Sequence, residues 1–139
     1  MENNKPYILY VEDDDLEVMK LKMAMASHNM EYPLEITTNG EEALTFLKSK
    51  LYDLPRLILL DLRMPRMNGF EFLKEIKNDV ALKRIPVIVL TSSSDENDVI
   101  QSFDLQVSGY FVKPFELANY NKMILQIGSY WEMSKISKA

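Results

Sequence analysis

The sequence contains no cysteine among its 139 residues and only one histidine, His28. The lack of cysteine excludes disulfide bonds, thiolate metal ligands and cysteine nucleophiles. It also fits a reducing compartment, so we expect a cytoplasmic protein. A single histidine excludes a His-rich metal cluster and leaves no choice of candidates for a Ser-His-Asp triad.

Long hydrophobic runs are also missing. No apolar segment approaches the ~20 residues that a membrane-spanning helix needs, and residues 1–5 are polar, unlike a signal peptide. Sixteen Lys and Arg against 21 Asp and Glu give a net charge of −5. This balance disfavours non-specific nucleic-acid binding, because phosphate contacts need clustered basic residues. We therefore expect neither a membrane nor a nucleic-acid partner.

Short apolar runs alternate with stretches of helical periodicity along the whole chain. Residues 57–60 and 87–90 are apolar at every position, as in strands buried on both faces of a parallel sheet. The alternation predicts an α/β fold with a doubly wound sheet. We expect one domain over residues 1–139, with a core of about 6–131 and short flexible ends. The expected strands are 6–11, 34–37, 57–60, 87–90 and 110–112, and the expected helices are about 16–26, 41–48, 70–76, 95–105 and 117–133.

Two local patterns make finer predictions. Leu16, Met19, Met23 and Ala26 recur at helical spacing, which indicates the apolar, core-facing side of the first helix. The dipeptide Asn68-Gly69 suits a turn in which the glycine has a positive φ.

Polar side chains follow the predicted strands at the point where each strand ends. Glu12 and Asp13 follow the first strand, and Asp61 follows the third. Thr91 follows the fourth strand and Lys113 the fifth. Parallel strands bring their carboxyl ends to one edge of the sheet, where ligands bind, so we expect these side chains to converge.

The converging groups indicate phosphoryl chemistry. Clustered carboxylates favour a hard divalent cation with oxygen ligands, Mg²⁺ above all, with Mn²⁺ as the alternative. An Asp carboxylate can attack phosphorus and form an aspartyl phosphate. The Thr91 hydroxyl and the Lys113 ammonium would then hold the phosphoryl oxygens.

The run of four acids after the first strand leaves two registers for the metal pair, Glu12/Asp13 or Asp13/Asp14. We choose Glu12/Asp13, because the acids must begin where the apolar strand stops. Asp14 and Asp15 then fall at the start of the helix, where carboxylates accept hydrogen bonds from free N–H groups and suit the helix dipole.

Four segments, in this order and at these spacings, resemble response-regulator receiver domains over about residues 7–127. They are Tyr7–Val11 followed by Glu12-Asp13, Leu60–Gly69 (LDLRMPRMNG), Val89–Ser92 (VLTS) and Gly109–Phe115 (GYFVKPF). The resemblance implies a flavodoxin-like three-layer sandwich with strand order 2-1-3-4-5 and five helices. It also implies a signalling domain rather than an enzyme, one that catalyses only its own phosphoryl transfer and slow autodephosphorylation.

The same resemblance implies a role for each site residue. Asp61 is the expected phosphoacceptor, and the expected metal ligands are Glu12, Asp13, Asp61 and the backbone carbonyl of Arg63. The expected phosphoryl-binding and switch residues are Thr91, Lys113 and Tyr110, and the Lys113–Pro114 peptide bond is expected to be cis.

The expected function is that of a stand-alone receiver in a two-component phosphorelay, with no attached DNA-binding output domain. A sensor histidine kinase or a phosphotransfer protein would supply the phosphoryl group, and an unidentified downstream protein would bind the surface remodelled over residues 95–133. Met123, Tyr130 and Met133 form a stripe that suggests a homodimer through this surface. Residues 54–56 and 77–86 are similar to small receivers encoded near phytochrome-like sensor kinases, although another kinase remains equally open.

The same residues bear on three other functions. An interaction module of receiver fold that works without phosphorylation remains the alternative, although the complete acid, Thr and Lys set argues against it. A haloacid-dehalogenase-type phosphatase needs a second Asp two residues after its nucleophile, where Arg63 stands. A flavodoxin needs a phosphate-binding loop after the first strand, where the acidic run Glu12–Asp15 would repel the cofactor phosphate.

Overall fold

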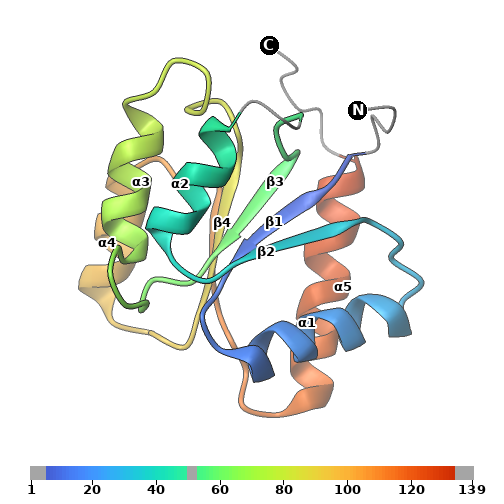
Figure 1. Ribbon diagram of the computed structural model, residues 1–139. Helices are drawn as coiled ribbons and strands as arrows, with labels where there is room; N and C mark the ends of the chain where they lie inside the picture. Colours follow the sequence, from blue (N-terminus) through green and yellow to red (C-terminus); the bar gives the residue numbers. More distant parts are fainter. Residues whose placement is uncertain (1–5, 50–52, 134–139) are drawn as a thin grey trace.

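The computed structural model describes residues 6–49 and 53–133 of the chain (Figure 1). Five strands alternate with five helices along these residues, as the sequence predicted. The strands are β1 (Ile8–Val11), β2 (Leu34–Thr37), β3 (Leu57–Leu60), β4 (Val87–Thr91) and β5 (Gly109–Val112). The helices are α1 (Asp15–Ser27), α2 (Gly40–Lys48), α3 (Gly69–Lys77), α4 (Glu96–Asp104) and α5 (Leu117–Met133).

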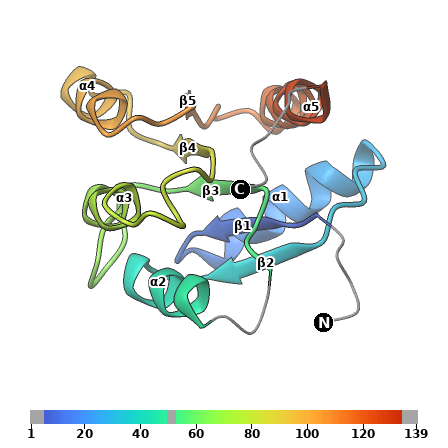
Figure 2. The same ribbon diagram turned by 90° about the horizontal axis from the view of Figure 1, so that it is seen from above.

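All five strands are parallel and lie in the order β2-β1-β3-β4-β5. Helices α1 and α5 cover one face of the sheet, and α2, α3 and α4 cover the other (Figure 2). This arrangement confirms the predicted doubly wound α/β fold and the strand order that the resemblance implied. The connections that follow β1 and β3 run to opposite sides of this strand pair, toward β2 and β4, so the crevice beyond the carboxyl ends of β1 and β3 is the expected ligand site.

Apolar side chains of the central strands fill a core on each face of the sheet. In β1, Leu9 and Val11 pack with residues of α2 and α3, whereas Ile8 and Tyr10 pack with residues of α1 and α5. Successive side chains of a strand point to opposite faces, so a strand covered on both sides is apolar at every position. The uniform burial of β3 and β4 has this origin.

Helix α1 turns a different side to the core from the one that its sequence pattern indicated. Leu16, Met19 and Met23 are 68%, 56% and 59% exposed, and the buried residues of α1 are Leu21, Ala24 and Met25. The predicted core face is therefore wrong, although the helix itself is correct. The helix carries apolar residues on two sides, and its packing against α5 and the sheet selects one of them.

Side chains at the helix starts satisfy free backbone N–H groups. Asp14 caps α1 by accepting from Leu16 N at 2.9 Å. Asn68 caps α3 in a reciprocal capping box with Glu71.

Gly69 has no positive φ, so the predicted backbone reason for this glycine is wrong. A Cβ at position 69 would lie 2.7 Å from the Asp61 carbonyl oxygen and 2.8 Å from Leu62 Cα. The glycine therefore lets α3 begin directly against the backbone of the Asp61 loop.

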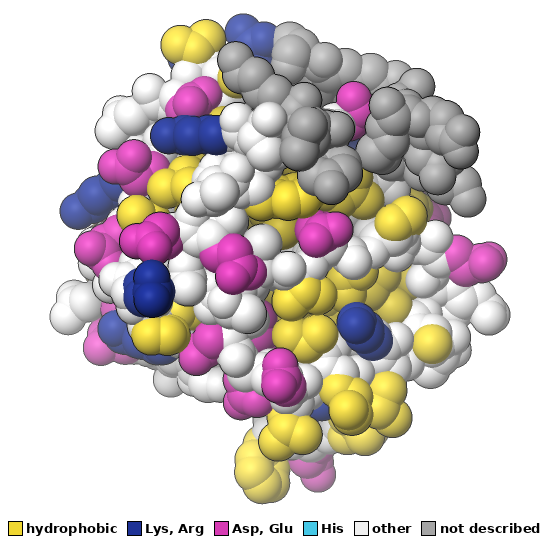
Figure 3. Space-filling model, in the orientation of Figure 1, with side chains coloured by type: hydrophobic (Ala, Val, Ile, Leu, Met, Phe, Trp, Pro, Cys, Tyr) yellow, Lys and Arg dark blue, Asp and Glu magenta, His cyan; other side chains and the backbone are white. Residues whose placement is uncertain are grey.

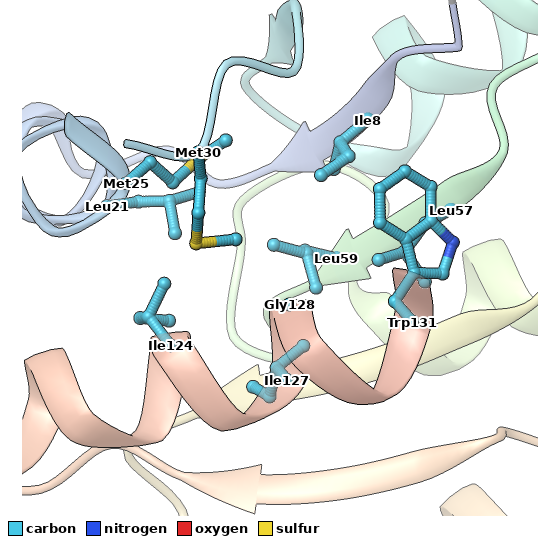
Figure 4. Close-up of a pocket in the computed structure, with 10 residues that line it drawn as sticks. All are labelled: Ile8, Leu21, Met25, Met30, Leu57, Leu59, Ile124, Ile127, Gly128 and Trp131. Atoms are coloured by element: carbon cyan, nitrogen blue, oxygen red, sulfur yellow. The ribbon is translucent and has the colours of Figure 1, made fainter. Parts of the chain in front are cut away.

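A cavity of about 20 Å³ remains between the sheet and the pair α1 and α5 (Figure 4). Its lining is almost entirely apolar, and Gly128 of α5 faces the end of the Met30 side chain there. A space of this size without polar partners holds no ligand. The end of the Met30 side chain takes the space that a Cβ at position 128 would need.

Candidate functional site

The carboxyl ends of four strands bring the predicted site residues to one edge of the sheet. The neighbouring strands β1 and β3 pair in register, with Val11 opposite Leu60. The acids that follow these two strands are therefore neighbours. Thr91 is the last residue of β4, and Lys113 follows β5, which pairs with β4.

Three carboxylates form a compact cluster at this edge. One oxygen from each of Glu12, Asp13 and Asp61 lies within 4.8 Å of the others. Glu12 and Asp61 are buried, whereas Asp13 is exposed. This donor set fits a hard divalent cation, because it supplies carboxylate oxygens and an exposed side on which the cation can keep its waters. The backbone carbonyl of Arg63, the fourth predicted ligand, belongs to the loop after Asp61.

Backbone groups orient two of these carboxylates. The N–H of Leu62 donates to Asp61 Oδ1 at 2.9 Å, and the N–H of Asp14 donates to Glu12 Oε2 at 3.1 Å. The first donor directly follows Asp61 and the second lies two residues after Glu12, so the local chain path orients the two carboxylates before any ligand arrives.

Lys113 lies inside the site with its side chain only 5% exposed. Its ammonium donates a hydrogen bond to Glu12 Oε1 at 2.8 Å and forms an ion pair with Glu17 Oε1 at 3.1 Å. Among the described side chains these two carboxylates are its ion-pair partners, and Asp61 acts on it only through a longer-range charge interaction. Glu17 did not figure among the predicted site residues, and its one sequence signal is an acid in the first turn of the helix that follows Glu12.

Burial dominates the electrostatics of the two buried acids. It raises the pKa of Glu12 from its ordinary value of 4.5 to about 7, against the opposing hydrogen bond from Lys113. Burial also raises the pKa of Asp61, while the charge of Lys113 and a hydrogen bond from Thr91 oppose the rise. Both carboxyls are thus short of positive charge, and a divalent cation at the cluster would favour their ionised forms.

The two predicted switch residues are linked through Ser93. Thr91 is buried, and its hydroxyl accepts a hydrogen bond from Ser93 N at 3.4 Å. The Tyr110 hydroxyl donates to the Ser93 carbonyl oxygen at 2.8 Å, while the ring packs against the core under α3. Ser93, in the loop after β4, therefore connects Thr91 to Tyr110 of β5 through hydrogen bonds.

One expectation about the backbone is wrong. None of the peptide bonds in residues 6–49 and 53–133 is cis, so the Lys113–Pro114 bond is trans in this structure. The trans form is the intrinsically favoured one for a bond before proline, by about 0.5–1 kcal/mol.

The fold and this site define a class of protein. Residues 8–125 match the family described as the response regulator receiver domain, and the chain belongs to that family. Response regulator Rcp1 of Synechocystis sp. is 40% identical over 135 residues, which cover 94% of this chain and 92% of Rcp1. Probable methanogenesis regulatory protein FilR2 of Methanothrix harundinacea is 33% identical over 137 residues, which cover 94% of this chain and 87% of FilR2.

Solved structures of response regulators superpose closely on this chain. The phosphorylated cyanobacterial phytochrome response regulator RcpA superposes with a TM-score of 0.89 at 32% identity, over 96% of this chain and 99% of RcpA. The Mn²⁺-bound form of Rcp1 superposes with a TM-score of 0.88 at 37% identity, over 95% of this chain and 99% of Rcp1. The chain is thus a response-regulator receiver of two-component signalling. Among its described helices, none has both the length and the apolar character that crossing a membrane requires.

Proposed function

We propose that residues 1–139 act as a single receiver domain that accepts a phosphoryl group from a phosphohistidine donor onto Asp61, with Mg²⁺ or Mn²⁺ bound at Glu12, Asp13 and Asp61. The observation that carries this proposal is the convergence of three carboxylates within 4.8 Å beside the buried Lys113 ammonium. The two relatives support it, because RcpA is described as phosphorylated and Rcp1 as Mn²⁺-bound. A kinase-coupled receiver of this kind would work in the cytoplasm.

The transfer step needs one attacking oxygen. A carboxylate oxygen of Asp61 forms a bond to phosphorus, the bond from phosphorus to the donor imidazole nitrogen breaks, and its electron pair stays on that nitrogen. The Leu62 N–H, 2.9 Å from Asp61 Oδ1, holds the carboxylate in place. The metal ion supplies neutralisation of the charge on the transferred group.

Two further side chains receive the phosphoryl oxygens. The hydroxyl of Thr91 is buried at the end of β4 and acts on Asp61, where it opposes the rise in the pKa of that carboxyl. The Lys113 ammonium lies in the same site, where it forms ion pairs with Glu12 and Glu17. To bind the phosphoryl oxygens it must redirect some of its N–H donors toward them. No other chemistry is proposed for the site beyond this transfer and slow hydrolysis of the aspartyl phosphate.

The surface around the site favours a protein as the donor. Exposed apolar side chains lie on α1 at Leu16, Met19 and Met23, and on the chain after β5 at Phe115 and Leu117. Figure 3 shows hydrophobic side chains gathered at the lower end of the molecule, over the start of α1 and the connection from β5 to α5. A small phosphodonor needs no such surface, whereas a kinase or phosphotransfer protein would cover it.

The test is incubation with acetyl phosphate and Mg²⁺, followed by intact-mass measurement. The wild type should gain one phosphoryl group, Asp61→Asn should gain none, and removal of the metal with EDTA should abolish the gain. Asp104→Asn is the matched control, because Asp104 is exposed at the end of α4, away from the acid cluster. A wild type that gains no mass would overturn the proposal and favour the phosphorylation-independent interaction module. An Asp61→Asn variant that gains as much as wild type would assign the phosphoryl group to another residue.

A further inference from the structure

The buried ammonium of Lys113 has a carboxylate partner outside the predicted ligand set. Glu17 lies in the first turn of α1, and its side chain is 20% exposed. Its Oε1 atom is buried 3.1 Å from Lys113 Nζ, in an ion pair that lacks the geometry of a hydrogen bond. Glu12, by contrast, accepts an aligned hydrogen bond from the same ammonium at 2.8 Å. Glu17 therefore holds Lys113 by charge, in a contact that is easier to give up.

Glu17 also has a second cation of its own. Its Oε2 atom accepts a hydrogen bond from Lys20 Nζ at 3.2 Å. Residues three apart on a helix are neighbours, so this pair forms within α1 itself. Lys20 Nζ also lies 4.9 Å from the ring centroid of Tyr120 in α5, which helps to keep it in place. Glu17 would thus keep a cation if Lys113 turned away.

The other partner of Lys113 has the same property once a metal is bound. Glu12 belongs to the acid cluster that fits a divalent cation. Losing one partner of a buried ion pair is costly when the other is left without compensation. With the metal beside Glu12 and Lys20 beside Glu17, neither carboxylate would be left alone. The Lys113 ammonium can then turn toward a new anion.

A phosphoryl group on Asp61 is such an anion, since it carries about −1.5 to −2 at neutral pH and offers three strong acceptor oxygens. Resting on the function proposed above, we propose that Glu17 is a positioning residue that holds the Lys113 ammonium in the unphosphorylated protein, and that the incoming phosphoryl group must take the ammonium from it. Glu17 then limits the rate at which Asp61 is labelled. Lys20 sets how firmly Glu17 holds Lys113, because it shares the charge of the same carboxylate.

The first test measures labelling by acetyl phosphate with Mg²⁺, and hydrolysis after the donor is removed, both by intact mass. Glu17→Gln should label about fivefold faster, the lower end of typical coupling between two sites. Its hydrolysis rate should equal that of wild type, because the contact with Glu17 is already lost in the aspartyl phosphate. Lys20→Met should label about twofold to threefold more slowly, the scale of an exposed ion pair, because Glu17 then depends on Lys113 alone. A merely structural role would not move the two labelling rates in opposite directions.

Matched controls remove the general effect of charge on an anionic donor. Asp15→Asn removes an exposed acid from the same turn as Glu17, and Lys22→Met removes an exposed lysine from the same helix as Lys20. Both should label close to the wild-type rate. Lys20→Arg keeps the cation and should retain the wild-type rate. The double variant Glu17→Gln/Lys20→Met should label like Glu17→Gln, because Lys20 acts through Glu17.

A second test needs neither metal nor phosphoryl group. The Cε–Hε NMR signal of Lys113, assigned by its absence from Lys113→Arg, reports on the surroundings of the ammonium in the metal-free protein. The signal should move in Glu17→Gln and stay in place in Asp15→Asn.

The outcomes separate the two proposals. A wild type that gains no phosphoryl mass overturns the proposed function and, with it, the control of labelling by Glu17. A wild type that is labelled normally, together with a Glu17→Gln variant that labels like Asp15→Asn or leaves the Lys113 signal unmoved, overturns the role of Glu17 alone. A Lys20→Met variant that labels as fast as Lys22→Met overturns the role of Lys20.

Discussion

The Lys113 ammonium lies 2.8 Å from a carboxylate oxygen of Glu12, and both side chains are almost completely buried. A second acid, Glu17 of α1, completes the surroundings of the ammonium at 3.1 Å. The only cation found in the acid cluster is therefore occupied before a phosphoryl group arrives, as far as the described residues show. This pairing makes Lys113 a structural residue of the unphosphorylated protein as well as a proposed phosphoryl ligand.

Replacing Lys113 by Met should destabilise the fold by about 3 kcal/mol, because the buried Glu12 carboxylate loses its cation. The measurement is urea unfolding at about pH 8, above the pKa of Glu12 of about 7, where this carboxylate is ionised. The matched control is Lys22→Met, an exposed lysine on α1, which should change the free energy of unfolding by no more than about 0.5 kcal/mol. Equal stability of the two variants would mean that the buried ion pair contributes nothing to the fold.

Binding of Mg²⁺ should strengthen as the pH rises from about 6 to about 8, because burial raises the pKa of Glu12 to about 7 and a protonated carboxyl disfavours the cation. The folded state holds a proton on Glu12 that the unfolded state, with its ordinary pKa of 4.5, has already lost. The contribution of Glu12 to stability therefore falls as the pH rises through about 7, and Mg²⁺ should restore it.

Isothermal titration with Mg²⁺ at a series of pH values measures this dependence. Glu12→Gln should flatten the profile, whereas Glu31→Gln, which removes an exposed acid, should leave it as in wild type. A Glu12→Gln profile as steep as that of wild type would assign the titration to another group.

Gly69→Ala should destabilise the protein by about 2 kcal/mol, because the new Cβ would lie under 3 Å from backbone atoms of Asp61 and Leu62 that cannot move independently. Gly128→Ala is the informative comparison, since its Cβ meets only the flexible end of Met30 beside a small cavity. Urea unfolding should rank Gly69→Ala as clearly less stable than Gly128→Ala. The opposite order would show that the start of α3 can shift away from the Asp61 loop.

Met19→Glu and Met23→Glu should leave the fold and labelling by acetyl phosphate unchanged, because both side chains are more than half exposed. Each should slow phosphoryl transfer from an autophosphorylated sensor kinase that labels the wild type, by about tenfold, the effect of losing one well-packed contact. Val80→Glu provides the control, since Val80 is 78% exposed in the α3–β4 connection. Unchanged kinase transfer in both methionine variants would exclude α1 from the donor interface.

Much of the fold could be predicted because its signals are local. The uniform apolar runs at residues 57–60 and 87–90 identify strands covered on both faces, and Asp14 and Asn68 stand where helices begin. The face of α1 could not be predicted, because Leu16, Met19 and Met23 share the helical period with the residues that became buried. Only packing against α5 and the sheet distinguishes the two sides.

Some residues of the candidate site could likewise be predicted from the sequence, and others could not. The acids, Thr91 and Lys113 could be named because each stands at the end of a strand, and a parallel sheet gathers its strand ends at one edge. Glu17 and Asp98 could not, because both are single acids at helix starts, where acids are common for reasons of the helix dipole. Their partners in the site, Lys113 and Arg63, lie far along the chain, and Arg63 is 35 positions before Asp98.

The sequence by itself determined the alternation of strands and helices and the kinds of chemical group at the strand ends, since both depend on neighbouring residues. The tertiary structure decided which cation each carboxylate binds and which side of α1 meets solvent. These depend on distances between segments that are remote in sequence, such as those of Glu12 and Lys113, which are 101 positions apart. Burial then sets the charge balance of the site, because only the folded chain removes water from Glu12, Asp61 and Lys113 together.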